Sequence, residues 1–174
     1  MIFNLKNYME VLLRPWRLSD AENLAQLANN PNIAKNLRDA FPHPYTMEHA
    51  VQFITMVHSK VPQTIFAIEY GGNLVGGIGL HPQNDIYKSN AELGYWIAEA
   101  YWGKGIVVEA IKKILPIGFS LPNIERIFAV PFGSNIGSQR VLEKTGFTLE
   151  AKLSKTLIKN GVYEDELIYA IRKA

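Results

Sequence analysis

The chain has 174 residues, of which 48% are hydrophobic and 20% charged, a balance typical of a globular protein with one substantial core. Its formal net charge of +2 and its lack of a basic run argue against a dedicated nucleic-acid binder. The absence of cysteine excludes disulfides, thiolate metal ligands and a cysteine nucleophile.

No apolar run approaches the length of a membrane span, and polar residues interrupt the N-terminus where a signal peptide would carry its apolar core. The chain shows no repeat, linker or low-complexity tract. We therefore expect one domain over residues 1–174, in a cytoplasmic protein that engages neither membrane nor nucleic acid. We expect a monomer or a homodimer.

The N-terminal part of the chain is predicted to hold one strand and two helices. Residues 9–18 predict a strand, and Ser19 and Glu22 follow it at the spacing of a capping box for a helix. That helix should end near residues 29–31, and a short second helix is expected at 33–37.

Caps and turns mark most of the remaining elements. Thr46 is the expected N-cap of a helix, and Gly71-Gly72 and Asn160-Gly161 predict the tight turns of two hairpins, the second spanning 152–173. Further helices are expected at 106–119 and 135–146. Further strands are expected at 64–70, 73–81, 90–98 and 125–132.

The order of these elements predicts an α+β fold with strands and helices intermixed. Hairpins connect most of the sheet, which makes it largely antiparallel. The segment 90–132 differs, because its strand–helix–strand order is long enough for a parallel crossover. Two parallel strands inside an antiparallel sheet can leave a gap where a ligand enters.

Gly103, Lys104 and Gly105 stand between a predicted strand and a predicted helix. Helix N-termini carry unpaired N–H groups and partial positive charge, and glycines let an anion approach them. An ordinary turn is the alternative reading of this pattern. A P-loop is excluded, because Gly105 follows Lys104 in place of Ser or Thr. A dinucleotide fingerprint is excluded, because Val108 replaces its third glycine.

Five stretches together resemble the GNAT superfamily of N-acetyltransferases, and within it the RimJ/RimL-type branch that includes ribosomal-protein N-terminal acetyltransferases. The stretches span nearly the whole chain and are LRPWRLSDAE, FPHPYTMEHAVQFI, AELGYWIAEAYWGKGIVVEA, NIGSQRVLEKTGF and LIKNGVYEDELIYAI. The resemblance implies a mostly antiparallel central sheet with one splayed parallel strand pair. It also implies acetyl-CoA as the cosubstrate and no metal.

The resemblance assigns the cofactor contacts by position. The acetyl-CoA signature falls on Trp102, Gly105 and Val107, and Val107 departs from the small residue usual there. The N–H groups of the loop, which includes Gly103, Lys104 and Ile106, would face the pyrophosphate. The pantetheine arm would pair with the strand at Ile97 and Ala98, positions that could otherwise serve ordinary strand pairing.

Asn135 and Ser138 lie at the start of the next predicted helix. Both residue types favour helix N-caps, so capping and cofactor contact are both open for Asn135. Many family members carry a tyrosine as general acid four residues beyond Ser138, but this chain has Leu142 there. The resemblance lets Ser138 take that role beside the CoA sulfur. Alternatively no acid is needed, because a thiol of pKa about 8.5 is already a tolerable leaving group.

The implied chemistry is direct attack of an amine on the thioester, which requires a group to take the amine's proton. Glu92 is the first candidate for this base, and a solvated strand-end carboxylate is the alternative reading. His81, at the end of a neighbouring strand, is the second candidate because its pKa suits the task. Tyr95 is expected to line the site or to belong to the core.

The acceptor implied by the resemblance is a primary amine, either a protein N-terminus or a small molecule. Glu164 and Asp165 on the last hairpin could attract its positive charge, or could form a charged edge that discourages aggregation. A GNAT fold that binds CoA without catalysing transfer remains the alternative function, as does a protein for another phosphate ligand.

Overall fold

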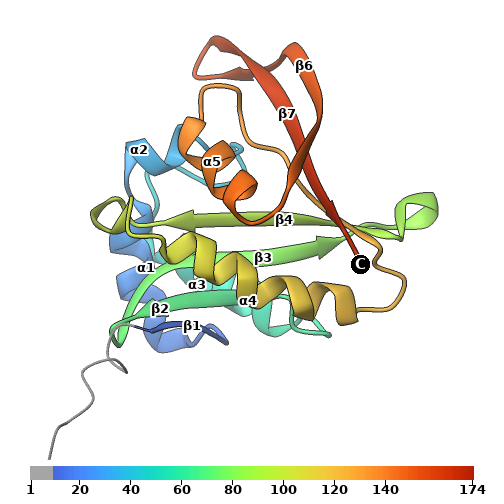
Figure 1. The fold of residues 1–174 in the computed structure, drawn as a ribbon. Helices are drawn as coiled ribbons and strands as arrows, with labels where there is room; N and C mark the ends of the chain where they lie inside the picture. Colours follow the sequence, from blue (N-terminus) through green and yellow to red (C-terminus); the bar gives the residue numbers. More distant parts are fainter. Residues whose placement is uncertain (1–9) are drawn as a thin grey trace, which may run out of the picture.

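A seven-stranded sheet in the order β1-β2-β3-β4-β5-β7-β6 organises the computed structural model, which describes residues 10–174 (Figure 1). The strands are β1 (Val11–Arg14), β2 (Ile65–Tyr70), β3 (Asn73–Pro82), β4 (Asn90–Ile97), β5 (Arg126–Ala129), β6 (Thr148–Lys159) and β7 (Val162–Arg172). The α-helices are α1 (Ala21–Ala28), α2 (Pro31–Ala34), α3 (Met47–His58), α4 (Ile106–Ser120) and α5 (Ile136–Lys144). The predicted mixed fold is confirmed.

Every neighbouring strand pair is antiparallel except β4 and β5, which are parallel. Their register pairs residues 90–92 of β4 with residues 126–128 of β5 and then stops. Strand β4 continues to Ile97 beside β3 alone. The splayed parallel pair expected from the sequence is therefore present, and it opens towards the carboxyl end of β4.

Apolar side chains cover both faces of the sheet and form two cores. One core joins α4 to inward residues of β3 and β4 such as Leu80 and Leu93. The other packs α1 and α3 around Trp16, with Trp96 of β4 at its border. Because successive strand residues alternate faces, β4 contributes to both cores, and its two faces belong to different surroundings.

Local signals in the sequence locate most element ends correctly. The Thr46 hydroxyl accepts from the His49 N–H at 3.3 Å and so caps α3 as predicted. Gly71-Gly72 and Asn160-Gly161 form the turns of the predicted hairpins, and all four residues have positive φ. The residues in each of these contacts are close together along the chain, which is why local propensity alone predicts them.

The first predicted strand and cap need correction. The strand expected at 9–18 ends at Arg14, because Pro15 cannot donate to a ladder and the chain then enters a 3₁₀ turn. Ser19 lies inside that turn and makes no capping bond. Asp20 stands at the N-cap position of α1 but makes no capping bond to that helix; its carboxylate instead accepts from the Arg17 N–H at 2.8 Å and closes the 3₁₀ turn. Residues 1–9 lie outside the described residues, and so does the prediction that the N-terminus lacks a signal-peptide core.

Two other predicted boundaries shift. Helix α2 begins at Pro31 and not at residue 33, because the Asn30 side chain caps it by accepting from the Asn32 N–H at 2.8 Å. Strand β5 is confined to Arg126–Ala129, shorter than the expected 125–132. Helix α4 ends at Ser120, within one residue of the prediction, and contains Pro116, because buried residues hold the helix to the sheet on both sides of the proline.

Candidate active site

Hydrogen bonds at its two ends show which main-chain groups of β4 face the gap beside β5. The Asn90 carbonyl accepts from the Gln83 N–H at 2.9 Å, and the Ala98 N–H donates to the Val75 carbonyl at 2.8 Å. The register between β3 and β4 is unbroken from one end to the other. By the alternation of an antiparallel ladder, even-numbered residues of β4 bond to β3 and odd-numbered ones face away from it.

The main chain of Tyr95 and Ile97 therefore faces the gap. The Ile97 carbonyl already accepts from the Trp102 indole N–H at 2.9 Å, which leaves the Ile97 N–H for a ligand. The Ala98 N–H is engaged by β3, so of the two strand positions expected to pair with the cofactor, only Ile97 faces the gap. The indole of Trp102 instead fixes the start of the glycine loop to the end of β4.

The glycine loop sits at the N-terminus of α4, next to this gap. Gly103 and Gly105 both have φ of +75°, and a Cβ at either would have open space around it. The first main-chain bond of the helix runs from the Glu109 N–H to the Gly105 carbonyl at 3.2 Å. The N–H groups of Ile106 and Val107 lie in the first turn of α4, where no intrahelical acceptor is available. No side chain caps the helix either. This geometry suits an anion.

Val107 and Lys104 complete the loop. The Val107 side chain is only 8% exposed and packs into the core, so its bulk faces the protein interior while its N–H remains at the helix terminus. Lys104 places its ammonium 4.9 Å from the centre of the Tyr101 ring, a cation–π contact that holds the positive charge beside the loop.

At the gap, a hydroxyl from α5 meets a hydroxyl from β4. Asn135 caps α5 by accepting from the Ser138 N–H at 3.1 Å, so the capping role is present. The Ser138 hydroxyl lies 2.6 Å from the Tyr95 hydroxyl. Burial raises the pKa of Tyr95 to about 12, although its hydrogen bond to Ser138 acts in the opposite direction. Leu142 is fully buried in the core.

The two candidate bases, His81 and Glu92, lie directly opposite one another in the β3–β4 register and so share one face of the sheet. This is the opposite face from Tyr95, because odd and even residues of β4 alternate. The Glu92 side chain is 20% exposed, and it accepts a hydrogen bond of 2.5 Å from the Arg38 guanidinium. Sequence reasoning missed Arg38, which lies 54 residues away along the chain.

His81 is poised to accept a proton. Desolvation lowers the pKa of His81 below 6.5, the positive charges of Lys60 and Arg38 lower it further, and Glu92 opposes the shift. The imidazole is therefore mostly neutral at pH 7, yet the residue remains open to solvent. A neutral imidazole in an accessible position can act as a general base.

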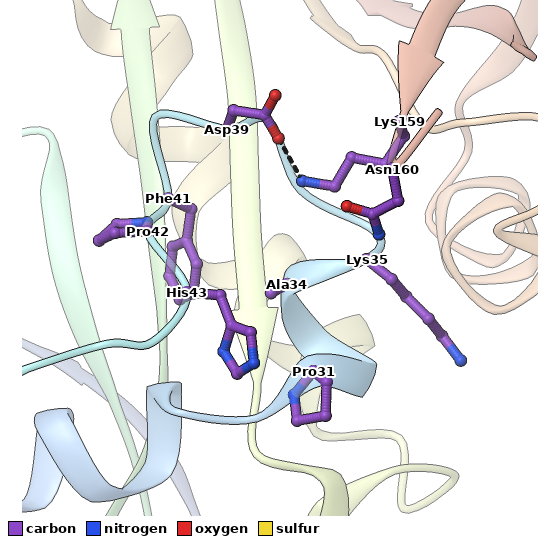
Figure 2. A pocket seen from close by; sticks show the side chains of 9 residues that line it. All are labelled: Pro31, Ala34, Lys35, Asp39, Phe41, Pro42, His43, Lys159 and Asn160. Atoms are coloured by element: carbon purple, nitrogen blue, oxygen red, sulfur yellow. Dashed lines mark hydrogen bonds and ion pairs between the residues drawn. The ribbon is translucent and has the colours of Figure 1, made fainter. Parts of the chain in front are cut away.

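Two cavities lie between the segment after α2 and the β6–β7 hairpin. The larger, of about 430 Å³, is crossed by an ion pair of 2.6 Å between Asp39 and Lys159 (Figure 2). The smaller, of about 220 Å³, shares that ion pair as one wall and also contains Arg38, the partner of Glu92. Arg38 thus links the smaller cavity to one of the candidate bases, Glu92.

The hairpin carboxylates expected to attract an amine are already engaged. Glu164 accepts from the Ser134 hydroxyl at 2.8 Å. Asp165 pairs with Lys152 at 3.1 Å and accepts from the Lys155 N–H at 3.0 Å, contacts that lower its pKa. The neighbouring Glu166, which sequence reasoning did not single out, lines the smaller cavity instead.

The described residues show neither a metal site nor a membrane-spanning helix. Over residues 10–174, no group of three or more His, Asp or Glu side chains could hold a metal ion. Within the same residues, no helix has the length and apolar character needed to cross a membrane.

Comparisons with known proteins identify the family of the chain. Residues 10–148 match the family described as the acetyltransferase (GNAT) domain. Ribosomal-protein-serine acetyltransferase of Escherichia coli (strain K12) is 28% identical over 147 residues, covering 84% of this chain and 78% of that protein. Spermidine N(1)-acetyltransferase of the same organism is 26% identical over 159 residues, covering 90% of this chain and 83% of that protein.

A solved structure resembles the whole fold. The microcin C7 self-immunity acetyltransferase MccE, in complex with acetyl-CoA and AMP, superposes with a TM-score of 0.81 at 28% identity, covering 94% of this chain and 93% of that one. Because the family match spans most of the chain, the protein belongs to the GNAT family and is an acetyl-CoA-dependent N-acetyltransferase.

Proposed function

We propose that the protein moves the acetyl group of acetyl-CoA to a primary amine, on a protein N-terminus or a small molecule, by direct attack of the amine on the thioester. One observation carries this proposal: β4 parts from β5 beyond Glu92, and the gap runs beside an uncapped helix N-terminus. The gap offers a slot for an extended chain, and the helix terminus offers N–H groups to its phosphates.

Each part of acetyl-CoA has a proposed place along the loop and the gap. The loop from Gly103 to Val107 would bind the pyrophosphate, with the Lys104 ammonium beside it. The pantetheine arm would follow the gap and pair with the Ile97 N–H. An N–H of β4 near that residue would also stabilise the oxyanion that forms on the thioester carbonyl.

The two faces of β4 divide the proton transfers. On one face, neutral His81 would take the proton of the attacking amine, while Arg38 holds the Glu92 side chain in place beside it. The new C–N bond forms as the C–S bond breaks. On the other face, the hydroxyl pair of Tyr95 and Ser138 would return a proton to the departing thiolate.

The acceptor class draws support from the relatives. One relative's name assigns it a ribosomal protein as substrate and another's assigns it spermidine, and both substrates present primary amines. The two cavities between the α2 segment and the last hairpin share Asp39 and Lys159, and the smaller is linked to Glu92 through Arg38; together they are the proposed acceptor entrance.

Thiol release from acetyl-CoA with a panel of peptides and small amines tests the proposal. We expect at least one amine to raise thiol release well above hydrolysis, with mass spectrometry showing an acetylated product. CoA binding without acceptor-dependent thiol release across the panel would favour a non-catalytic CoA-binding protein. Calorimetry showing no CoA affinity, with tight binding of another nucleotide, would overturn the donor assignment.

A further inference from the structure

The smaller cavity combines apolar walls with a charged entrance. It lies between the segment after α2, the segment after β5, and the β6–β7 hairpin. Its apolar side chains are Val130, Phe132, Leu157 and Ile158. At about 220 Å³ it is smaller than the roughly 300–1,000 Å³ of typical small-molecule sites, so it suits a short apolar group.

Charges in this cavity are neutralised except at one position. Arg38 pairs with Glu92 at 2.5 Å, and Lys159 pairs with Asp39 at 2.6 Å. Glu166 accepts only a 3.3 Å hydrogen bond from the Thr156 hydroxyl, and no cation within the described part of the chain pairs with it. The cavity therefore presents a single uncompensated carboxylate.

The main chain holds Glu166 firmly in place. Strand β7 forms a bridge with Phe132 at Glu166, and the Leu167 N–H donates to the Pro131 carbonyl at 3.1 Å. The half-buried carboxylate is thus carried by paired backbone and not by a free loop. A charge held in this way needs little reorganisation to bind a cation.

We infer that Glu166 binds the ammonium group of the acceptor, and that the preferred acceptor is a monoamine or a peptide N-terminus with an apolar side chain. The inference rests on the proposed transfer to an amine and names its substrate class. One carboxylate complements one cation, while apolar walls contact the group beside it. A second cation, as in a polyamine, would meet the side chains of Arg38 and Lys159.

The conservative variant Glu166→Gln tests the inference. It keeps the size and the Thr156 hydrogen bond and removes the charge. With an apolar N-terminal peptide we expect KM to rise roughly tenfold or more and kcat to stay within about twofold, because the lost contact is made before the chemical step. Glu164→Gln, two residues along the same strand, should leave both constants near wild type, since the Ser134 hydroxyl binds that carboxylate.

Binding measured without turnover separates this inference from the proposed function. Calorimetric titration of the CoA-saturated protein with the same peptide should show weaker binding to Glu166→Gln than to wild type, at unchanged CoA affinity. Equal affinity of both proteins, or a higher kcat/KM of the wild type for spermidine than for apolar monoamines, overturns the inference even if transfer occurs. If no amine supports turnover, the proposed function fails and the titration still tests Glu166.

Discussion

The hydroxyls of Tyr95 and Ser138 lie 2.6 Å apart, joining β4 to α5 across the end of the gap. Burial raises the pKa of Tyr95 to about 12, so this phenol carries its proton at neutral pH. The protonated phenol can therefore donate a hydrogen bond to Ser138, which places a chain of hydroxyls at the proposed position of the departing thiolate. The chain thus has a tyrosine at this site, although it comes from a strand and not from the helix position occupied by Leu142.

Removing either hydroxyl should slow thiol release. For Tyr95→Phe and for Ser138→Ala we expect kcat to fall roughly 10- to 100-fold, at or below the usual range for general acid catalysis because a thiol leaves readily. CoA affinity, measured by calorimetry, should change little. Steady-state kinetics with one acceptor at saturating acetyl-CoA provides the measurement.

The double variant of Tyr95 and Ser138 is the control for this pair. Because the two hydroxyls are expected to act as one unit, the double variant should be no slower than the worse single variant. Effects that multiply would show that the two hydroxyls act separately, and an unchanged kcat in both single variants would remove them from the reaction.

His81 should govern the acid limb of the pH–rate profile. Its pKa is lowered from 6.5, so the neutral, proton-accepting form is lost only as pH falls below that value. We expect kcat/KM to decline below about pH 6.5 for this reason, apart from any limb that belongs to the amine, near pH 8 for a peptide N-terminus and near pH 10 for an alkylamine. His81→Gln should lose the limb and reduce kcat by about 10² or more.

Glu92→Gln distinguishes the two candidate bases. Glu92 raises the pKa of His81, so its neutralisation should move the acid limb to lower pH, lower turnover, and leave CoA affinity nearly intact. An acid limb that persists in His81→Gln and disappears in Glu92→Gln would identify Glu92 as the base in place of His81.

Local chemistry explains which parts of this fold could be predicted. The capping residues Thr46 and Asn135 satisfy N–H groups three residues ahead, so the sequence alone locates those helices. The strand–helix–strand segment 90–132 is long enough for a parallel crossover, and this length pointed to the parallel pair. Ser19 failed as a cap because it lies inside the 3₁₀ turn Leu18–Asp20, which places the start of α1 at Ala21, and spacing alone does not reveal that turn.

The parts of the site that could not be predicted depend on contacts between distant segments. Arg38 reaches Glu92 over 54 residues, and Tyr95 reaches Ser138 over 43. No periodicity encodes such pairs, because each depends on how separate elements pack. Glu166 likewise differs from Glu164 only through the neighbours that the folded chain supplies.

Gly105→Val should weaken CoA binding at least tenfold. Gly105 has φ of +75° with open space around it, so a branched Cβ adds both backbone strain and bulk at the proposed phosphate site. Gly72→Val is the matched control, because Gly72 has φ of +78°, equally open surroundings, and a place in the β2–β3 turn. Calorimetry with CoA should show normal affinity for Gly72→Val, and equal affinity for Gly105→Val would mean that the glycine loop is only a turn.

Asp20→Asn should destabilise the fold in a pH-dependent way. Arg14 and Asp20 are 14% and 9% exposed and pair at 2.8 Å. Burial raises the pKa of Asp20, but hydrogen bonds from Arg14 and the Arg17 N–H outweigh it and lower the pKa below 3.8. Because the folded pKa is the lower one, the stabilisation is present above pH 3.8 and is lost as pH falls through the folded value.

Urea unfolding followed by tryptophan fluorescence would measure this effect. Removing one partner of a largely buried pair should cost about 3 kcal/mol at pH 7, and the difference from wild type should shrink below about pH 3.8 as Asp20 protonates. Glu109→Gln, which breaks the exposed pair with Lys112, should cost less than about 1 kcal/mol. If the loss of stability in Asp20→Asn stayed constant down to pH 3, the effect would come from packing and not from the charge. A contribution from the charge must change with pH in this range, because Asp20 takes up its proton there.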